Sequence, residues 1–466
     1  MNITENRSDT IAAIATAPGM GAIAVIRLSG DLSLTHALSL FLRKNKPMKS
    51  DQVKSHHSYF GILQQADTII DEVLMTYFKG PYSYTGEDVI EISCHGSEYI
   101  QERIMQILVD IGVRQAQPGE FTLRAFLNGK MDLSQAEAVA DLIASQSNIG
   151  HRMAMSQMRG GFSEQINALR DQLLKFASLL ELELDFSEED VEFANRDEFM
   201  KLIRDISETL TWLIQSFKAG NVLKKGIPVA IIGKPNAGKS TLLNAILNEE
   251  RALVSEIPGT TRDSIEDTFI IDGYSFRFVD TAGLRQSEDQ VENMGIARTY
   301  DKMQQASIIL YVCDISTMNV NETDNMLEEF KEYIQDDNKH FILVANKIDQ
   351  MEQLPAQIRE IFELDTVFVS AKRKENIHEL TEKLVSIVKQ TSLSSDVMVN
   401  NSRHYEALTG ALNALKQAES GFINQTPSDL VAIDVRQALY YLGTITGTIT
   451  NDEILGSIFS KFCIGK

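Results

Sequence analysis

The chain of 466 residues is 43% hydrophobic and 23% charged, which is typical of a globular protein with roughly two to four domains. Its net charge of −21, from 44 basic and 65 acidic residues, argues against a surface built as a whole to bind nucleic acid. The polar start argues against a signal peptide, and no apolar run reaches membrane-spanning length. The three cysteines show no metal-binding spacing, so we expect a cytoplasmic protein without disulfides.

The N-terminal part mixes two kinds of secondary structure. Strand-like runs occur as IAAIAT, AIAVIRLSG, EVLMTYF and DVIEISC, and one helical stretch reads YIQERIMQILVDIG. We therefore predict an α/β domain over residues 1–127.

Helical periodicity dominates residues 128–225 and returns over residues 391–466. In the first stretch one helix face gathers apolar side chains, namely Ile166, Leu169, Leu173, Ala177, Leu180 and Leu184. Between the two helical stretches, residues 226–390 carry strand-like runs, and FIIDGYSFRF predicts a hairpin. This order predicts a domain inserted into a helical domain whose two parts pack together.

The inserted domain begins with a phosphate-binding loop. The run VAII, residues 229–232, predicts a buried strand, GKPNAGKS follows at residues 233–240, and leucines at helical spacing come next. In such a loop, backbone N–H groups and the helix N-terminus bind phosphate oxygens. Lys239 would reach the β- and γ-phosphates, and the Ser240 hydroxyl would bind Mg²⁺.

Three further motifs select the nucleotide. DTAG, residues 280–283, offers a carboxylate to the Mg²⁺ shell and a glycine N–H to the γ-phosphate. In NKID, residues 346–349, the Asp349 carboxylate can accept the N1–H and the exocyclic amine of guanine, which adenine cannot supply. SAK, residues 370–372, is typical of the loop that closes over guanine. GTP is therefore the predicted nucleotide, in a domain that resembles translation-factor-like GTPases.

The residue after DTAG is unusual. Leu284 stands where Ras-like GTPases carry the glutamine that orients water, and a leucine cannot do so. Glu288, Asp289 and Glu292 are nearby candidates for that role, and the residues alone do not separate them.

Several segments along the whole chain are distinctive. They are APGMGAIAVIRLSG, YTGEDVIEISCHG, PGEFTLRAFLNGKMDLSQAEAV, EIPGTTRD and the C-terminal run LGTITGTITNDEILGSIFSKFCIGK. These segments resemble the MnmE (TrmE) family of bacterial tRNA uridine-modification GTPases, and the last one looks like the C-terminal signature of that family. One departure is Met20, which stands in place of an expected arginine.

The resemblance implies an N-terminal domain similar to the tetrahydrofolate-binding domain of aminomethyltransferases, which also forms a homodimer. It implies a helical domain that carries an inserted Ras-like P-loop GTPase domain. Together with an FAD-containing partner, MnmG (GidA), such a protein forms a heterotetramer and adds an aminomethyl or carboxymethylaminomethyl group to C5 of wobble uridine. Folate would bind in its 5-formyl or methylene form, the methylene form would supply the carbon, and tRNA would bind mainly through the partner.

The resemblance also assigns site residues. Catalysis would fall to Glu292, which would orient water, together with Asn236 and Lys239. The ion and folate ligands would be Asn236, Ser255, Ile257 and Thr260 for K⁺, Ser240 and Thr261 for Mg²⁺, and Arg27, Glu87, Lys130 and Lys466 for folate. The remaining nucleotide contacts would be Ala237, Gly238, Thr241, Glu256, Pro258, Gly259, Asp280, Thr281, Ala282, Gly283, Asn346, Lys347, Asp349, Ser370, Ala371 and Lys372. Cys463 stays open between a nucleophile, a positioning group and a structural residue.

The rival interpretation is a ribosome-assembly GTPase of the Era or Der type, which shares the GTPase motifs and the apolar residue after DTAG. Such proteins usually add a KH-type RNA-binding module or a second GTPase domain. Neither a basic segment with GXXG nor a second phosphate loop is evident in the sequence. A folate enzyme with a purely regulatory GTPase is a third possibility.

Overall fold

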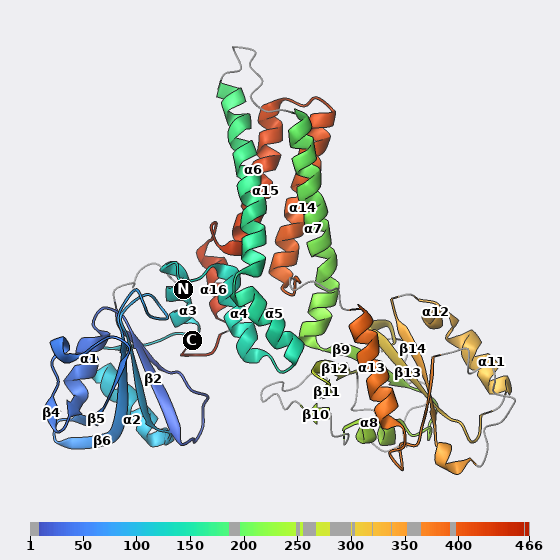
Figure 1. Ribbon diagram of the computed structural model, residues 1–466, viewed down its shortest axis with the longest axis horizontal. Helices are drawn as coiled ribbons and strands as arrows, with labels where there is room; N and C mark the ends of the chain where they lie inside the picture. Colours follow the sequence, from blue (N-terminus) through green and yellow to red (C-terminus); the bar gives the residue numbers. More distant parts are fainter. Residues whose placement is uncertain are drawn as a thin grey trace. The chain divides into compact units, whose positions relative to one another are not determined.

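The computed structural model describes residues 9–185, 196–247, 252–254, 267–279, 300, 303–318, 320–336, 338–351, 365–391, 398–460 and 462–465. Its contacts form two compact units. Figure 1 labels their helices and strands. The first holds Met1–Ala140, Gln157–Leu202 and Asn413–Lys466, and the second holds Asp141–Ser156 and Ile203–Leu412. Within the described ranges, no helix is long and apolar enough to cross a membrane.

The first unit begins with an eight-stranded sheet in the order β4-β3-β5-β6-β7-β2-β1-β8. Its strands are β1 (Ile11–Ile14), β2 (Ile23–Ser29), β3 (Phe41–Arg43), β4 (Lys46–Pro47), β5 (His57–Gln65), β6 (Thr68–Phe78), β7 (Val89–His95) and β8 (Arg114–Gln115). Its helices are α1 (Ser33–Leu40), α2 (Glu98–Asp110) and α3 (Glu120–Leu127). All neighbouring strands are antiparallel except β1 and β8.

The two faces of this sheet differ. Side chains of α1 and α2 pack with alternate residues of β2, β5, β6 and β7 in one hydrophobic core. The opposite face is covered by Phe121 of α3 along β1 but is exposed along β5 and β6, where Phe60 and its cross-strand partner Leu74 are 63% and 41% exposed. Because successive side chains of a strand point to opposite faces of the sheet, one set lies in the core and the other lies at the surface.

The helical segments are α4 (Leu133–Ala144), α5 (Asn148–Met158), α6 (Gly161–Asp185), α7 (Arg196–Lys225), α14 (Ser402–Ile423), α15 (Ser428–Thr446) and α16 (Asp452–Phe459). In the first unit α6 and α15 lie side by side. The Phe199 ring of α7 stacks on Phe176 of α6 at 3.7 Å and packs on Phe422 of α14 at 4.3 Å. In the second unit Phe217 of α7 stacks on Tyr405 of α14. These contacts confirm that the two helical parts pack together.

The second unit contains a seven-stranded sheet in the order β10-β11-β12-β9-β13-β14-β15. Its strands are β9 (Ile227–Ile232), β10 (Ala252–Val254), β11 (Asp267–Ile271), β12 (Tyr274–Phe278), β13 (Ile308–Asp314), β14 (His340–Asn346) and β15 (Thr366–Val369). Its helices are α8 (Lys239–Leu247), α11 (Val320–Glu329), α12 (Lys331–Ile334) and α13 (Ile377–Thr391).

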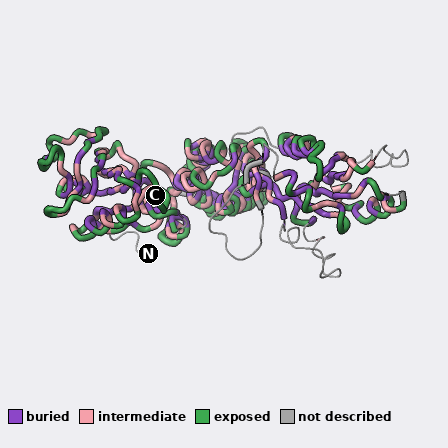
Figure 2. Tube along the Cα trace, turned by 90° about the horizontal axis from the view of Figure 1, so that it is seen from below, coloured by how far each residue is buried: buried purple, intermediate pink, exposed green. Residues whose placement is uncertain are grey.

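The central strands β9, β13 and β14 of this sheet are buried on both faces. Figure 2 draws buried residues in purple. Val229 and Ile231 join the core shared with α8 and α13, whereas Ala230 and Ile232 join the core shared with α11. Parallel strands covered by helices on both sides need apolar side chains at every position, which explains the run VAII. In the spatial order β12-β9-β13-β14-β15, all neighbouring strands are parallel, as in a Ras-like domain.

The predicted hairpin is confirmed, because β11 pairs antiparallel with β12 across Asp272 and Gly273. Both turn residues have positive φ, 50° and 84°, which suits the Asp-Gly pair. The expected fold class, an α/β domain and a helical domain with an inserted P-loop domain, is confirmed. The expected domain limits stay predictions; those at residues 127 and 225 coincide with the ends of α3 and α7.

Candidate functional site

The phosphate loop has the expected position between β9 and α8. Gly233 and Gly238 have φ of 140° and 96°. A Cβ at Gly233 would lie 2.1 Å from the Val312 carbonyl oxygen, and one at Gly238 would lie 2.3 Å from the Asn346 side-chain nitrogen. Both positions therefore require glycine for space as well as for backbone conformation.

The side chain of Lys239 folds back over this loop. Its Nζ lies 2.8 Å from the carbonyl oxygens of both Gly233 and Lys234. Ser240 and Thr241 follow in the first turn of α8 and are exposed. A cationic group and two hydroxyls are thus gathered where the loop meets the helix, a set suited to phosphate and Mg²⁺.

Asn346 joins three of the predicted motifs. Its side-chain Nδ2 donates to the Ala237 carbonyl at 2.8 Å, and its Oδ1 accepts the Ala371 N–H at 3.0 Å. The residue is 2% exposed. One amide therefore holds the phosphate loop, the NKID motif and the SAK loop in fixed relation.

Asp349 is held in a defined orientation by the SAK loop. The Ser370 hydroxyl donates to Asp349 Oδ1 at 2.7 Å, and Arg373 Nε lies 3.8 Å from Oδ2. The carboxylate is 8% exposed. The hydrogen bond from Ser370, with the nearby charges of Arg373 and Lys372, lowers the pKa of Asp349, so the group stays ionised near neutral pH.

Lys347 contacts the end of a neighbouring strand. It has a φ of 68°, and its Nζ lies 2.6 Å from Asp314 Oδ2 at the end of β13. The carboxyl ends of parallel strands meet at one edge of the sheet, where α/β folds bind ligands.

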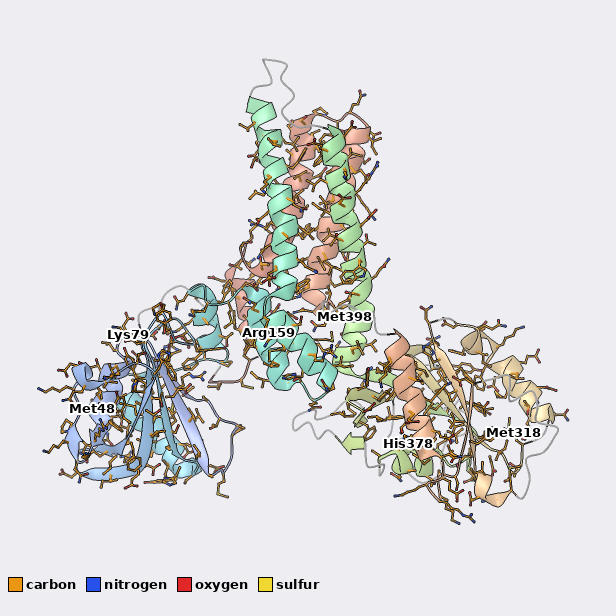
Figure 3. All side chains as sticks on the ribbon, in the orientation of Figure 1. Met48, Lys79, Arg159, Met318, His378 and Met398 are labelled. Carbon is orange, nitrogen blue, oxygen red and sulfur yellow. The ribbon has the colours of Figure 1, made fainter. Side chains whose placement is uncertain are left out.

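A cavity of about 240 Å³ lies beside the phosphate loop. Asn236, which has a φ of 61°, lines it together with Tyr311, Asp314 and Met318, the last labelled in Figure 3. Cys313 also borders this space, but burial raises the pKa of its thiol to about 12, so the thiol stays neutral. This agrees with the expectation that Cys313 belongs to the core.

Several predicted site residues lie outside the described residues. They are those at positions 255–261 and 280–283, together with Glu292 and Lys466. Their roles stay predictions.

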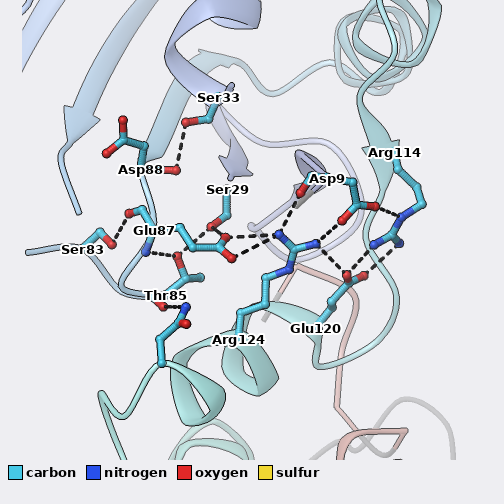
Figure 4. A network of polar contacts seen from close by, with 11 residues as sticks. Asp9, Ser29, Ser33, Ser83, Thr85, Glu87, Asp88, Arg114, Glu120 and Arg124 are labelled. Atoms are coloured by element: carbon cyan, nitrogen blue, oxygen red, sulfur yellow. Dashed lines mark hydrogen bonds and ion pairs between the residues drawn. The ribbon is translucent and has the colours of Figure 1, made fainter. Parts of the chain in front are cut away.

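In the first unit, Glu87 belongs to a polar cluster shown in Figure 4. The Ser29 hydroxyl donates to Glu87 Oε2 at 2.7 Å, and Arg124 Nη1 lies 3.2 Å from the same oxygen. Arg124 Nη2 also binds Asp9 Oδ1 at 2.6 Å and Glu120 Oε1 at 3.1 Å. The Arg124 side chain is 7% exposed, so one buried guanidinium joins three carboxylates.

Arg114 closes the other side of this cluster. Its Nε lies 2.5 Å from Asp9 Oδ2, and its Nη2 lies 2.5 Å from Glu120 Oε1. Burial alone would raise the pKa of Glu120, but hydrogen bonds from Arg114 and from the Gln117 N–H outweigh burial and lower it. The pKa of Asp9 is lowered in the same way, by Arg114 and Arg124 against burial.

The other predicted folate residues lie around the loop that carries Glu87. Arg27 pairs with Glu91 at 2.8 Å, and its guanidinium lies 5.3 Å from the centre of the Tyr84 ring. Lys130 Nζ donates to the Pro81 carbonyl at 2.8 Å. Segment 81–87 therefore contacts or contains all three predicted residues.

Sequence reasoning missed Arg124, Arg114, Asp9 and Glu120. A signal was present, because Glu120 and Arg124 stand four apart in the segment PGEFTLRAF that carried the resemblance. Asp9 had no such signal, since it meets Arg124 only through folding.

The C-terminal tail reaches the N-terminal sheet domain. The Gly119 N–H points to the Cys463 carbonyl at 3.4 Å, and Phe462 is buried. Gly465 has a φ of 97°, and a Cβ there would lie 2.3 Å from the Ile14 carbonyl oxygen. Cys463 is exposed and free.

Comparison with known families and proteins agrees with this geometry. Residues 133–463 match the MnmE helical domain, and residues 10–130 match the GTP-binding protein TrmE N-terminus. The tRNA modification GTPase MnmE of Cytophaga hutchinsonii is 51% identical over 463 residues, covering 99% of this chain and 98% of that protein. The chain belongs to the MnmE family.

Other MnmE relatives are equally complete matches. That of Flavobacterium psychrophilum is 51% identical and covers 98% of this chain and 99% of the relative. That of Bacteroides fragilis ATCC 25285 is 49% identical, again covering 98% and 99%. Membership in the MnmE family confirms the resemblance and argues against the Era or Der interpretation.

Proposed function

We propose that the chain hydrolyses GTP and that this hydrolysis serves the modification of tRNA. The observation that carries the proposal is the arrangement of Asn346 and Asp349 at the edge of the sheet, where one fixes the loops and the other presents an ionised carboxylate. The relatives named tRNA modification GTPase MnmE support the second half.

Guanine selection follows from hydrogen-bond chemistry. A carboxylate only accepts, and guanine presents two adjacent donors, N1–H and the exocyclic amine. Adenine has an unprotonated N1 at the same place, so Asp349 would lose a partner and face a lone pair. A carboxylate left without a partner is penalised, which favours GTP over ATP.

Two metal ions are proposed to bind at the loop. Ser240 with Thr261 would bind Mg²⁺, and Asn236 with Ser255, Ile257 and Thr260 would bind K⁺. Asn236 is exposed on the loop itself, and its amide oxygen is a suitable ligand for a hard cation. Potassium, when bound, would supply positive charge against the charge that develops during phosphoryl transfer.

Glu292 is proposed to orient the attacking water, since Leu284 cannot. Glu292→Ala should bind GTP with nearly unchanged affinity and hydrolyse it far more slowly. Nucleotide titration and single-turnover kinetics separate these two effects. Unchanged single-turnover hydrolysis would transfer the role to Glu288 or Asp289.

A tetrahydrofolate derivative is proposed to bind around Glu87, Arg27, Lys130 and Lys466. Glu87 fits the donors of a pterin, because within the part of the chain that the structure describes its Oε1 meets only Arg124 Nη1, at 3.4 Å, and keeps room to accept an N–H. Methylene-tetrahydrofolate, when bound, would supply the one-carbon unit for the uridine.

The chain is proposed to work with an FAD-containing partner, MnmG (GidA), in a heterotetramer. The product would carry an aminomethyl or carboxymethylaminomethyl group at C5 of wobble uridine. The net charge of −21 supports tRNA binding mainly through the partner, because phosphate contacts need clustered cations. A tRNA substrate and three free thiols favour a cytoplasmic setting.

A homodimer through the N-terminal sheet is proposed as well. The face opposite α1 and α2 carries Phe60, Leu74 and Ile23, which are 63%, 41% and 66% exposed. Exposed apolar side chains on one sheet face are typical of an interaction surface. Sedimentation velocity checks this proposal, and a monomer at micromolar concentration would contradict it.

Analysis of tRNA nucleosides tests the central proposal. A strain that lacks this protein should lose the modified wobble uridine, and the intact gene should restore it. The Asp349→Asn variant should restore it poorly at normal GTP levels. Unchanged wobble uridine in the deletion strain would overturn the tRNA role and leave the GTPase role standing.

A further inference from the structure

We propose that Arg124 positions Glu87 for the pterin ring, so that binding of folate depends on a guanidinium that does not itself touch the ligand. This inference rests on the proposed folate site. It concerns a residue that the motifs did not single out and that Figure 4 places at the centre of the polar cluster.

The Arg124 guanidinium is held by several partners at once. Nη1 donates to the Asp9 backbone carbonyl at 2.9 Å and approaches Glu87 Oε2 at 3.2 Å. Nη2 binds Asp9 and Glu120. Because Asp9 and Glu120 hold one nitrogen of a planar group, the other nitrogen points at Glu87 in a fixed direction.

The two oxygens of the Glu87 carboxylate have different surroundings. Ser29 and Arg124 both approach Oε2, at 2.7 and 3.2 Å, whereas Oε1 receives the same guanidinium at 3.4 Å. The Ser29 hydroxyl is itself 2.6 Å from Thr85 Oγ1 and belongs to a fully buried residue. One oxygen is thus anchored, and the anchor sets the direction in which the other oxygen meets a ligand.

The buried ion pair between Arg124 and Glu87 adds little net stability, because desolvation offsets much of its Coulomb energy. Its fixed geometry is the property that a ligand can use. The Glu87 side chain is 15% exposed, which leaves one edge of an otherwise buried carboxylate open to a ligand. Holding that edge rigidly reduces the entropy lost when the ligand binds.

Arg114 provides a matched control within the same cluster. It pairs with Asp9 and Glu120, as Arg124 does, and its described contacts do not include Glu87. Its replacement disturbs the cluster to a similar extent without removing an anchor from Glu87. A difference between the two arginines therefore reports on Glu87 and not on general stability.

The test is a double-mutant cycle measured by calorimetric titration of 5-formyl-tetrahydrofolate into the full chain. Arg124→Lys keeps the charge and loses the fork, and should weaken binding roughly ten- to hundredfold. Glu87→Gln should weaken it at least as much. The double variant should lose no more than Glu87→Gln alone, because both changes remove one function. The folate affinity of Arg114→Lys should stay within about threefold of the parent's affinity, which is a smaller change than the loss of one charged hydrogen bond would cause.

Three outcomes would overturn the proposal. They are parent-like affinity in Arg124→Lys, losses that add in the double variant, and an equal loss in Arg114→Lys. Should Arg124→Lys fail to fold, Asp9→Asn takes its place, because this change loosens the same guanidinium. Asp9→Asn should weaken folate binding by less than the loss expected of Arg124→Lys. It should weaken folate binding no further when combined with Glu87→Gln. A parent chain that does not bind the folate overturns the folate site and this inference with it. Additive losses in a chain that binds overturn the Arg124 role alone.

Discussion

At the scale of single residues, the nucleotide site depends on backbone positions that few side chains tolerate. Gly233 and Gly238 leave no space for a Cβ, and Asn236 and Lys347 adopt left-handed φ values of 61° and 68°. Such conformations cost a non-glycine residue roughly 1–2 kcal/mol. Asn236 lies in the phosphate loop and Lys347 follows Asn346, which contacts that loop, so both strained positions lie beside the proposed nucleotide site.

Asp349→Asn should exchange nucleotide preference. The amide presents an N–H to the donors of guanine, so GTP affinity should fall about tenfold or more. Xanthosine triphosphate carries an oxygen in place of the amine, so the variant should bind it more tightly than the parent does. Competition between the two nucleotides measures the change.

Ser370→Ala is the control for that exchange. It keeps the carboxylate and removes only the hydrogen bond from Ser370. The affinity for GTP should therefore fall less than in Asp349→Asn, and the affinity for xanthosine triphosphate should not rise. An unchanged GTP preference in Asp349→Asn would show that NKID does not read guanine.

Asn236→Ala and Asn236→Gly should both lose the potassium stimulation of GTP hydrolysis. Alanine also strains the backbone at a φ of 61°, by about 1 kcal/mol, whereas glycine does not. Turnover in K⁺ and in Na⁺, compared between the two variants, separates loss of the ligand from loss of stability. Stimulation that persists in the glycine variant would remove Asn236 from the metal site.

At the scale of elements, the polar cluster joins β1, β8 and α3 through charges. Asp9 precedes β1, Arg114 begins β8, and Glu120 and Arg124 lie on α3. These elements are short, so side-chain pairs add to the hydrogen bonds that hold them. The cluster therefore ties the sheet edge to the helix beside the proposed folate site.

The pKa values of Asp9 and Glu120 predict a pH dependence for these elements. Both pKa values are lowered in the folded state, against burial, because arginines pair with the carboxylates. Their stabilisation is present above the unfolded pKa of about 4 and is lost as the pH falls through the folded pKa. Arg114→Gln should move this loss to higher pH and cost about 1–2 kcal/mol at pH 7, since the Arg114 side chain is 35% exposed.

Hydrogen exchange of peptides from residues 9–16 and 112–127, from about pH 2 to pH 7, measures this shift. Each variant is compared with the parent at the same pH. Lys130→Gln is the control, because Lys130 binds a carbonyl and should leave the pH dependence unchanged. An Arg114→Gln profile parallel to that of the parent would contradict the account.

At the scale of the whole molecule, the inserted GTPase domain and the N-terminal sheet domain each carry a different proposed site. The GTPase motifs lie in the second unit, whereas the N-terminal sheet and the C-terminal tail lie in the first. The tail packs on Gly119 and Ile14, although more than three hundred residues separate it from both in sequence. Each unit therefore presents its own site for separate testing.

Removal of residues 464–466 should leave GTP hydrolysis nearly intact, because the phosphate loop belongs to the other unit. It should weaken folate binding and abolish tRNA modification, since Gly465 lies against the Ile14 carbonyl at the sheet domain. Lys466→Ala, which keeps that packing, isolates the contribution of the terminal side chain. Modified wobble uridine in cells that carry only the truncated chain would show the tail to be dispensable.

The sequence by itself determined the local chemistry of the nucleotide site. The strand–loop–helix of residues 227–247 and the Asp-Gly hairpin follow from periodicity and from glycines at fixed places, which are properties of contiguous residues. Tertiary structure decided which distant groups meet. Asn346 reaches a carbonyl 109 residues away, and Arg124 reaches Asp9 across 115 residues. Such pairs leave no period or motif in the sequence, because they arise only when the strands assemble and burial makes each charge require a partner.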